Sequence, residues 1–419
     1  MNFNPQYADD IVLFLGFVLY PILAWATLSV LRGKPGEIGF GLLNLVAAFA
    51  ITIFYAPESS NKFKLIVFSV YVSIILASYG LLLWSKRKGA DWSVAPLVFP
   101  ILFMVAVRFV PDQFVAAGQK PGASLQAGMA PFFVGISYLT FRLSHLAQEV
   151  HNDVAELPPL SRYLSFAFFA PTLILGPISP YSAFSESLSQ RSTTRPDVPA
   201  CLFRMLVGLV KYLFISTLLN QLSFKGLILD GHLHSWFDFL LAALVFPMYL
   251  YCNFSGFCDL AIGAAGLIGI EIHENFDRPF SARNIQEFWN RWHMTLSRWF
   301  RDILFTPMVK VLGRRFGPKS IQSVTAVSIV ISFVLIGIWH GSGLNFLLFG
   351  LMQGLGVATV FLWTMYLKRR LGAKRFNVAR EHPWIRFASI GTTYCFFAAS
   401  LVLWANPMDE LVKVFSAIR

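Results

Sequence analysis

Long apolar runs separated by short polar or charged stretches fill most of this 419-residue chain. A helix needs roughly 20 apolar residues to cross about 30 Å of hydrocarbon. Runs of about this length lie at 11–31, 38–56, 65–84, 94–110, 128–143, 200–222, 236–254, 320–339, 344–367 and 384–405. Two shorter apolar stretches, 163–178 and 256–270, are interrupted by Pro and Gly and predict partial or re-entrant segments that need surrounding protein. The pattern predicts an all-α polytopic integral membrane protein with roughly 10–12 transmembrane helices.

Composition supports this fold class. Apolar residues make up 56 % of the chain and charged residues only 13 %, and the mean hydropathy is +0.60. These values exclude a soluble globular enzyme, a disordered chain and an ordinary nucleic-acid-binding domain. Because the chain shows neither a repeat nor a low-complexity linker, we expect residues 1–419 to form a single membrane domain.

The net charge of +12 is concentrated in three clusters. Residues 86–88, 298–319 and 368–386 carry net charges of +3, +5 and +6, so the rest of the chain is slightly acidic. Lys and Arg accumulate on the cytoplasmic side of a membrane. The clusters therefore predict a cytoplasmic location for themselves and, counting crossings back from Lys86, an N-terminus outside. The charge indicates topology and contact with membrane lipid, not affinity for nucleic acid.

One histidine stands alone in a long uncharged stretch. Residues 320–367 contain no Asp, Glu, Lys or Arg, and their only histidine is His340. Since both ends of the stretch are basic, it predicts a hairpin that enters and leaves on the cytoplasmic side, with His340 near its turn. An ionisable group at depth is a functional-site hypothesis, and a neutral imidazole could act as a general base. A histidine that only bonds to a neighbouring helix is the structural alternative.

A second histidine lies in an aromatic, charged segment. Apolar residues at 285, 288, 289, 292, 296, 299, 300 and 303 follow helical spacing. They predict one continuous amphipathic helix that lies along the cytoplasmic interface or dips partly into the protein, with His293 on the same flank as Trp289 and Leu296. Taken alone, such an aromatic stripe with a histidine is more often an interface anchor than a site.

Several short blocks of this sequence resemble the membrane-bound O-acyltransferase family. They are Asn-Phe-Asp-Arg-Pro-Phe at 275–280, Phe-Trp-Asn-Arg-Trp-His at 288–293 and Ile-Trp-His-Gly at 338–341, with earlier anchors at 135–142 and 176–178. The resemblance covers about residues 130–365. It implies a ring of helices around a central funnel, in which an acyl thioester from the cytoplasm meets an acceptor hydroxyl from outside.

Two bacterial branches of the family fit different blocks. The 135–142 block, the short chain and the run 303–310 are similar to teichoic acid D-alanyltransferases. The segment 253–263 is more similar to the branch that acetylates alginate and other exopolysaccharides such as cellulose. The resemblance therefore implies an O-acyltransferase of the bacterial cytoplasmic membrane, transferring a D-alanyl or an acetyl group to an envelope polymer, directly or through a relay protein.

The resemblance also implies roles for particular residues. His340 would be the catalytic base, and His293 would orient the donor. Substrate-channel residues would be Trp289, Asn290, Trp292, Trp339 and Ser342. An acidic acyl carrier protein would deliver a phosphopantetheine thioester, so no permanently bound cofactor and no metal are expected. Its dock would comprise Val309, Lys310, Leu312, Arg314 and Arg315, with Val309 and Leu312 exposed; anchoring to anionic lipid is the alternative for these positive charges.

A transporter is the hypothesis from another class. An intramembrane histidine also suits a proton-coupled carrier, whose coupling site tends to include an acidic residue at depth. Asp259 is the only such candidate, and the chain shows no repeated halves.

Overall fold

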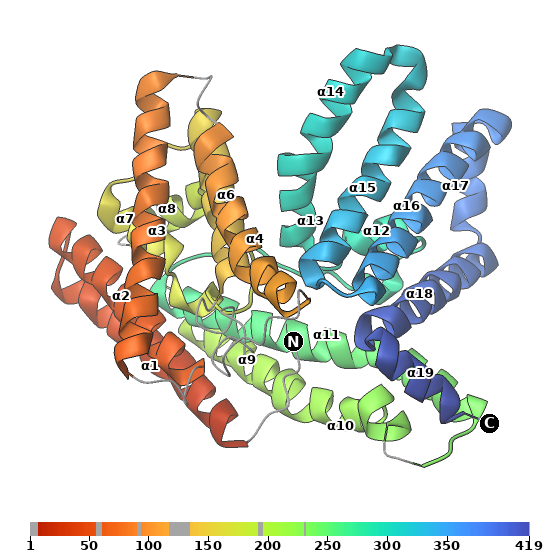
Figure 1. The fold of residues 1–419 in the computed structure, drawn as a ribbon, viewed down its shortest axis with the longest axis horizontal. Helices are drawn as coiled ribbons and strands as arrows, with labels where there is room; N and C mark the ends of the chain where they lie inside the picture. The colour runs from red at the N-terminus through yellow and green to blue at the C-terminus, as the bar shows by residue number, and fades with distance from the viewer. Residues whose placement is uncertain are drawn as a thin grey trace. The chain divides into compact units, whose positions relative to one another are not determined.

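The structure is a computed structural model that describes residues 7–55, 61–89, 94–116, 135–191, 196–229 and 232–418. The described ranges are mostly helical (Figure 1), and β-type pairing is limited there to the isolated bridges His234–Ile418 and Phe276–Trp292. The all-α fold class is confirmed. The first six residues and positions 128–134 of the predicted span 128–143 lie outside the described ranges.

The described residues fall into two compact units, 1–208 with 257–273, and 209–256 with 274–419. The predicted single domain and the ring around a funnel stay predictions. The helices found wholly or mainly in the first unit are α1 (Tyr7–Val30), α2 (Lys34–Tyr55), α3 (Asn61–Lys88), α4 (Val94–Ala116), α6 (Ile136–His151), α7 (Leu160–Ala167), η3 (Ala170–Thr172), α8 (Tyr181–Gln190) and α9 (Val198–Leu209).

The second unit contains the segments that carry both histidines. Its helices are η4 (Val210–Ile215), α10 (Ser216–Gln221), η5 (Phe224–Ile228), most of α11 (Trp236–Ile268), η6 (Pro279–Ser281), α12 (Ile285–Trp289), α13 (Met294–Phe300), η7 (Arg301–Phe305), α14 (Thr306–Phe316), η8 (Pro318–Ser320), α15 (Ile321–His340), α16 (Leu344–Leu371), α17 (Ala373–Glu381), α18 (Pro383–Ala405) and α19 (Met408–Ser416).

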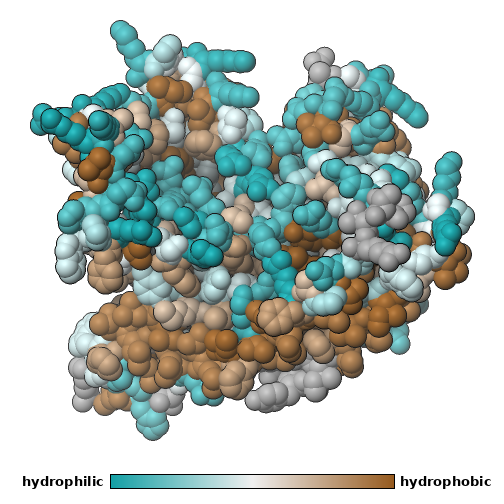
Figure 2. All heavy atoms as spheres, turned by 180° about the vertical axis from the view of Figure 1, so that it is seen from behind, coloured by the Kyte–Doolittle hydropathy of each residue, from teal (hydrophilic) through white to brown (hydrophobic). Residues whose placement is uncertain are grey.

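Eight helices in the described part of the chain are long and apolar enough to cross a membrane, and they cover eight of the ten predicted spans. The chain is a multi-pass membrane protein. Of the other two predicted spans, 94–110 forms α4, whose apolar part is the shorter Val94–Val107, and the described end of 128–143 begins α6. Figure 2 shows apolar side chains over broad areas of the surface. On the helix that runs from Val198 to Ile228, exposed residues include Leu202, Phe203, Leu206, Phe214 and Leu218.

The prediction of a separate re-entrant piece at 256–270 is wrong, because this stretch continues α11 without a break. Its glycines serve close packing. A side chain at Gly263 would lie 2.5 Å from Met205 Cγ, and one at Gly266 would lie 2.7 Å from Cys201 Sγ. These glycines therefore let α9 approach α11, and tertiary packing outweighs their low helix propensity.

The other predicted partial segment, 163–178, is a short helix followed by irregular backbone. Arg142 of α6, only 2 % exposed, supplies the missing hydrogen bonds. Its guanidinium donates to Phe166 O at 3.2 Å and Ala167 O at 3.3 Å, and also to both oxygens of Thr172. Carbonyls at a helix end have no partner within the helix. A single buried arginine therefore stabilises the end of α7.

The predicted hairpin over 320–367 is confirmed, and it depends on small residues. Helices α15 and α16 pack along their lengths, joined by a turn at 341–343. A Cβ at Gly337 would lie 2.3 Å from Phe346 O, and one at Gly350 would lie 2.5 Å from Phe333 O. Gly350 and Gly354 form a small-xxx-small pair, the pattern that lets membrane helices approach closely.

We expect Gly350→Ala to destabilise the protein, because its new methyl group would collide with backbone of α15. Overpacking of this kind costs about 1–3 kcal/mol. Gly80→Ala in α3 is the matched control, since nothing lies within 4 Å of a Cβ there and Ala favours a helix over Gly by about 0.5–1 kcal/mol. Thermal unfolding in detergent should show a lower midpoint for Gly350→Ala alone. Equal midpoints for the two variants would contradict the close packing.

Candidate active site

His293 lies in a break between two helices. The predicted continuous helix over 285–303 is wrong, since α12 ends at Trp289 and α13 starts at Met294. The backbone between them pairs with an upstream segment: Asp277 N–H donates to Arg291 O, and Met294 N–H donates to Asn275 O, each at 2.9 Å. These bonds replace the helical ones, so the apolar spacing continues while the helix does not.

The same pairing holds His293 in an unusual conformation. Its φ of 45° and ψ of 51° are left-handed, a conformation that costs a non-glycine residue on the order of 1–3 kcal/mol and persists only where the surroundings enforce it. Here the bridge between Phe276 and Trp292 sits next to it in sequence. The turn therefore points the imidazole away from the helical flank that the sequence pattern predicted.

Asn275 fixes the tautomer of His293. Its Oδ1 lies 3.0 Å from His293 Nδ1, 3.3 Å from Thr295 N and 2.9 Å from Thr295 Oγ1. Because the backbone N–H of Thr295 can only donate, the shared atom must be the amide oxygen. His293 Nδ1 therefore carries the hydrogen, and the lone pair of the neutral ring is on Nε2.

Burial keeps this ring neutral. His293 is 5 % exposed, and the Phe254 ring packs edge-on against it at 4.7 Å. Burial, and to a smaller extent repulsion from His340, lower the pKa of His293 to about 3. The electrostatic effect of His340 on this pKa means that the two histidines lie close enough to interact. At neutral pH, His293 is an acceptor at Nε2 and a donor only toward Asn275.

His340 is the last residue of α15, at the turn where the sequence predicted it. Four rings surround the half-buried imidazole, with centroids 4.6 Å away for Trp339, 5.8 Å for Trp404, 6.2 Å for Phe349 and 6.4 Å for Phe346. The next residue must be small, because a Cβ at Gly341 would lie 2.3 Å from the Phe346 ring.

The predicted channel residues differ in their surroundings. Trp289 and Trp292 are 7 % and 5 % exposed and belong to an aromatic core; Trp292 stacks on Phe288 with centroids 5.5 Å apart. Asn290 and Ser342 are exposed, and Trp339 is half-buried. Their part in a substrate channel stays a prediction.

A buried polar chain links α12 to two membrane-spanning helices. Trp289 Nε1 donates to Gln353 Oε1 at 2.9 Å, and Gln353 Nε2 donates to Ser400 Oγ at 2.6 Å. Within hydrocarbon such groups need partners. These two hydrogen bonds therefore connect α12, the helix before His293, to α16 and α18. Helix α16 belongs to the hairpin whose turn follows His340.

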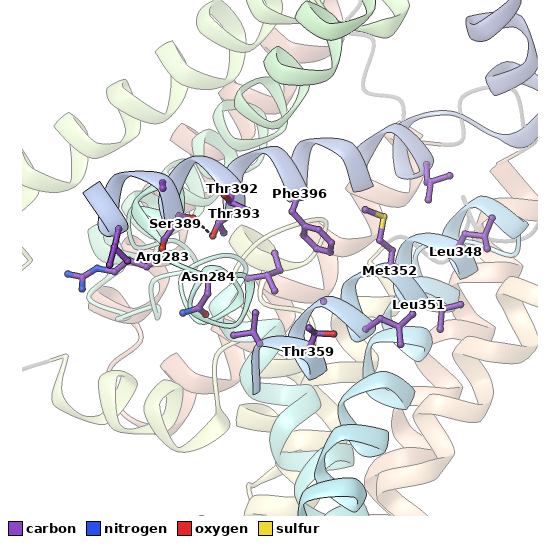
Figure 3. Close-up of a pocket in the computed structure, with 17 residues that line it drawn as sticks. Arg283, Asn284, Leu348, Leu351, Met352, Thr359, Ser389, Thr392, Thr393 and Phe396 are labelled. Carbon is purple, nitrogen blue, oxygen red and sulfur yellow. Dashed lines mark hydrogen bonds between the residues drawn. The ribbon is translucent and has the colours of Figure 1, made fainter. Parts of the chain in front are cut away.

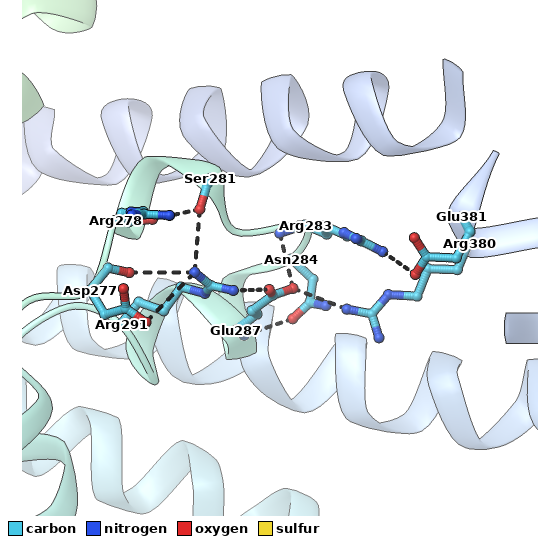
Figure 4. A network of polar contacts seen from close by, with 9 residues as sticks. All are labelled: Asp277, Arg278, Ser281, Arg283, Asn284, Glu287, Arg291, Arg380 and Glu381. Carbon is cyan, nitrogen blue, oxygen red and sulfur yellow. Dashed lines mark hydrogen bonds and ion pairs between the residues drawn. The ribbon is translucent and has the colours of Figure 1, made fainter. Parts of the chain in front are cut away.

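Glu287 is the centre of an ion-pair network beside the His293 turn (Figure 4). Its carboxylate accepts from Arg291 and from Arg380 of α17, both at 3.0 Å. Asn284 caps its helix by accepting from Glu287 N–H at 2.8 Å. Since Arg291 O accepts the Asp277 N–H, this network braces the backbone pairing that shapes the turn.

The carrier-docking prediction needs one correction. On α14, Lys310, Arg314 and Arg315 are exposed as expected, but Val309 and Leu312 are half-buried. The apolar residues that α14 exposes are Val311 and Phe316, at 64 % and 58 %. The helix lies against α15, so its 309 and 312 positions face inward more than the sequence suggested.

Asp259, the acidic residue of the transporter hypothesis, is paired. Its Oδ1 lies 3.1 Å from Arg204 Nε, between α11 and α9. Among the described residues, no group of three or more His, Cys, Asp or Glu side chains could hold a metal ion.

The sequence interpretation missed Asn275, Thr295 and Gln353. Asn275 belongs to the 275–280 block, but nothing in the block indicated that it bonds to a histidine 18 residues later. Glu287 and Arg291 stand four residues apart, a spacing that could have indicated their pairing. The only sequence signal for Gln353 was a side-chain amide within an otherwise apolar helix.

Comparison with known proteins assigns the class. The model of the membrane-bound O-acyltransferase family matches residues 48–379, and the chain belongs to this family. It is therefore an O-acyltransferase, which favours the enzyme over the transporter.

Its relatives include two kinds of enzyme. The chain is 27 % identical over 400 residues to a teichoic acid D-alanyltransferase of Bacillus subtilis, covering 94 % of this chain and 97 % of that protein. A teichoic acid D-alanyltransferase of Streptococcus thermophilus is 30 % identical over 67 % of this chain and 69 % of its own length. The Pseudomonas aeruginosa protein named "Probable alginate O-acetylase" is 30 % identical over 77 % of this chain and 61 % of its own length.

We expect His293 to make stability depend on pH. Its pKa is about 3 when folded and about 6.5 when unfolded, so the unfolded chain binds the proton first as pH falls. Stability is then full above pH 6.5 and declines between 6.5 and 3. From pH 7.5 to 5.0 this residue should remove about 2 kcal/mol.

His293→Gln, which can still donate to Asn275 but does not titrate, is the comparison. Unfolding free energies measured at both pH values should show a smaller decline for this variant by about that amount. If both proteins declined equally, His293 would not be held neutral by burial.

Proposed function

We propose that this enzyme transfers a D-alanyl group from a carrier-protein thioester to a hydroxyl of an extracytoplasmic envelope polymer. The observation that supports this choice is coverage from end to end: the B. subtilis D-alanyltransferase matches over 97 % of its length, whereas the alginate enzyme extends well beyond the match.

Acetyl transfer to an exopolysaccharide is the second candidate. It is favoured by the 253–263 segment, which resembles that branch, and by 30 % identity to the alginate enzyme over 77 % of this chain. The two reactions share their chemistry and differ in the acyl group and in the acceptor.

In the proposed reaction His340 is the general base. The acceptor hydroxyl attacks the thioester carbonyl carbon while His340 takes the hydroxyl proton. The C–S bond then breaks, and the leaving thiolate of the phosphopantetheine arm takes that proton. The products are an oxygen ester and a free thiol, so no oxidant or metal is needed.

His293 has a different role in this proposal. With its hydrogen fixed on Nδ1 toward Asn275, its Nε2 can accept a hydrogen bond from an amide N–H of the pantetheine arm or from the ammonium of a D-alanyl group. A group with a pKa of about 3 is a weak base at neutral pH. It is better suited to hold the donor than to remove the hydroxyl proton.

The donor partner in this proposal is a small acidic carrier protein that docks on α14. Exposed Lys310, Arg314 and Arg315 would attract it, and exposed Val311 and Phe316 would give it apolar contact. This requires the basic clusters to be cytoplasmic and the N-terminus outside, in the bacterial cytoplasmic membrane. The positive-inside rule supports that orientation.

We expect His340→Ala to insert and fold yet lose acyl transfer by about 10²–10⁴-fold, the usual contribution of a general base. The measurement is radiolabel moved from D-alanyl carrier protein to acceptor in vesicles. His382→Ala, at an exposed histidine before α18, is the matched control and should retain activity. Near-normal turnover in folded His340→Ala would refute the assignment.

The docking surface has its own test. Arg314→Glu with Arg315→Glu should weaken capture of the carrier protein by about tenfold or more, because like charges would then face each other. Lys374→Glu with Arg375→Glu makes the same change of charge on exposed positions of α17 and should leave capture unchanged. Equal capture by both double variants would favour the lipid-anchor explanation for α14.

A further inference from the structure

An open groove of about 990 Å³ lies between α16 and α18 (Figure 3). It is lined by neither histidine and by none of the predicted channel residues. The Phe396 ring lies against the backbone of α16, where a Cβ at Gly356 would come within 2.6 Å of it. This glycine allows the ring to form part of the groove wall, so the groove is built by close helix packing.

The groove is polar at one end and apolar at the other. Arg283, Asn284, Ser389, Thr392 and Thr393 gather at one end in Figure 3. The other end carries the side chains of Leu348, Leu351 and Met352. A ligand that matches both ends must be amphipathic, with an apolar chain and a polar head.

The length of the groove suits a lipid chain of one leaflet. Its lining on α16 runs from Leu348 to Val360, about 18 Å at 1.5 Å per residue. Half of a bilayer's hydrocarbon is about 15 Å thick. A transmembrane helix of a partner protein would instead need a surface about 30 Å long.

Positive charge marks the polar end. Residues 368–386, which run from the last turn of α16 through α17 to the start of α18, carry a net charge of +6. Arg386 is exposed and follows the lining residue Ile385. Arg283 is paired with Glu381, whose side chain is 64 % exposed. The Arg283 side chain is only 19 % exposed, but its carboxylate partner reaches water, which screens and weakens the pair. An anionic group could therefore replace that carboxylate at Arg283.

We propose that this groove binds an anionic phospholipid. One acyl chain lies along Leu348, Leu351 and Leu355, the glycerol esters lie near Ser389 and Thr392, and the phosphate lies at Arg283 and Arg386. Clusters of Lys and Arg at the cytoplasmic ends of membrane helices attract anionic lipid headgroups, and here an apolar groove of matching length adjoins such a cluster. The lipid would fix the position of α18 against α16.

The test counts lipids that purified protein retains, by native mass spectrometry, after addition of phosphatidylglycerol or of phosphatidylcholine with the same chains. Wild-type protein should retain phosphatidylglycerol about fivefold more tightly, the effect expected of one basic residue near the headgroup. Arg283→Gln should bring the two lipids to nearly equal binding. Glycerol phosphate at millimolar concentration should not compete, because it has no acyl chain.

Ala388→Trp is designed to fill the groove and should weaken lipid retention by about tenfold. Gly391→Trp is the matched control, because Gly391 is exposed on the same helix, does not line the groove and has nothing within 4 Å of a Cβ placed there. Equal retention by the two Trp variants, or equal binding of the two lipids by wild-type protein, would overturn the proposal. A change in oligomeric mass with Ala388→Trp alone would also overturn the proposal, because it would indicate that a second copy of the chain occupies the groove.

A photoreactive phosphatidylglycerol with a diazirine on one acyl chain gives a measurement that needs no variant. Cross-links should map to peptides of α16 and α18 that include Leu348, Leu351 or Leu355. Cross-links confined to other helices would overturn the proposal even if a Trp variant failed to fold.

Discussion

The short backbone pairing between 275–277 and 291–294 is the constraint on which the site depends. It ends α12, forces His293 into a left-handed conformation and brings Asn275 Oδ1 to the imidazole. One buried amide oxygen then serves three donors and determines which ring nitrogen keeps its lone pair. The strain of the turn is tolerated because the surrounding bonds fix it on both sides.

Close packing of small residues positions His340, whereas hydrogen bonds position His293. Gly337, Gly350 and Gly354 let α15 and α16 touch along their backbones, and Gly341 leaves room for the Phe346 ring beside the histidine. The Trp289–Gln353–Ser400 chain connects the two arrangements. A neutral His293 with its lone pair on Nε2, and His340 among aromatic rings, suit the donor binding and the proton transfer from a hydroxyl that we propose for this O-acyltransferase.

The spans, the hairpin and the place of His340 could be predicted, because apolar length and missing charge are local properties of the sequence. The break at His293 could not, since its cause is pairing with residues 14 to 19 positions upstream while the helical spacing of apolar residues continues unbroken. The same limit explains 256–270, where Gly263 and Gly266 pack against α9 instead of ending the helix. It also explains why the buried side of α14 was not predicted, since that side is determined by packing against α15.

The central claim is that His293 is a neutral ring with its hydrogen on Nδ1. It is chemically distinct from the nearby His340. Nitrogen NMR of protein carrying ¹⁵N-labelled histidine, assigned with His293→Gln, reports tautomer and charge directly. We expect a His293 signal with an unprotonated Nε2 that does not change between pH 8 and pH 5. A His293 that titrates near its ordinary pKa of about 6.5, or that carries its hydrogen on Nε2, would contradict the account.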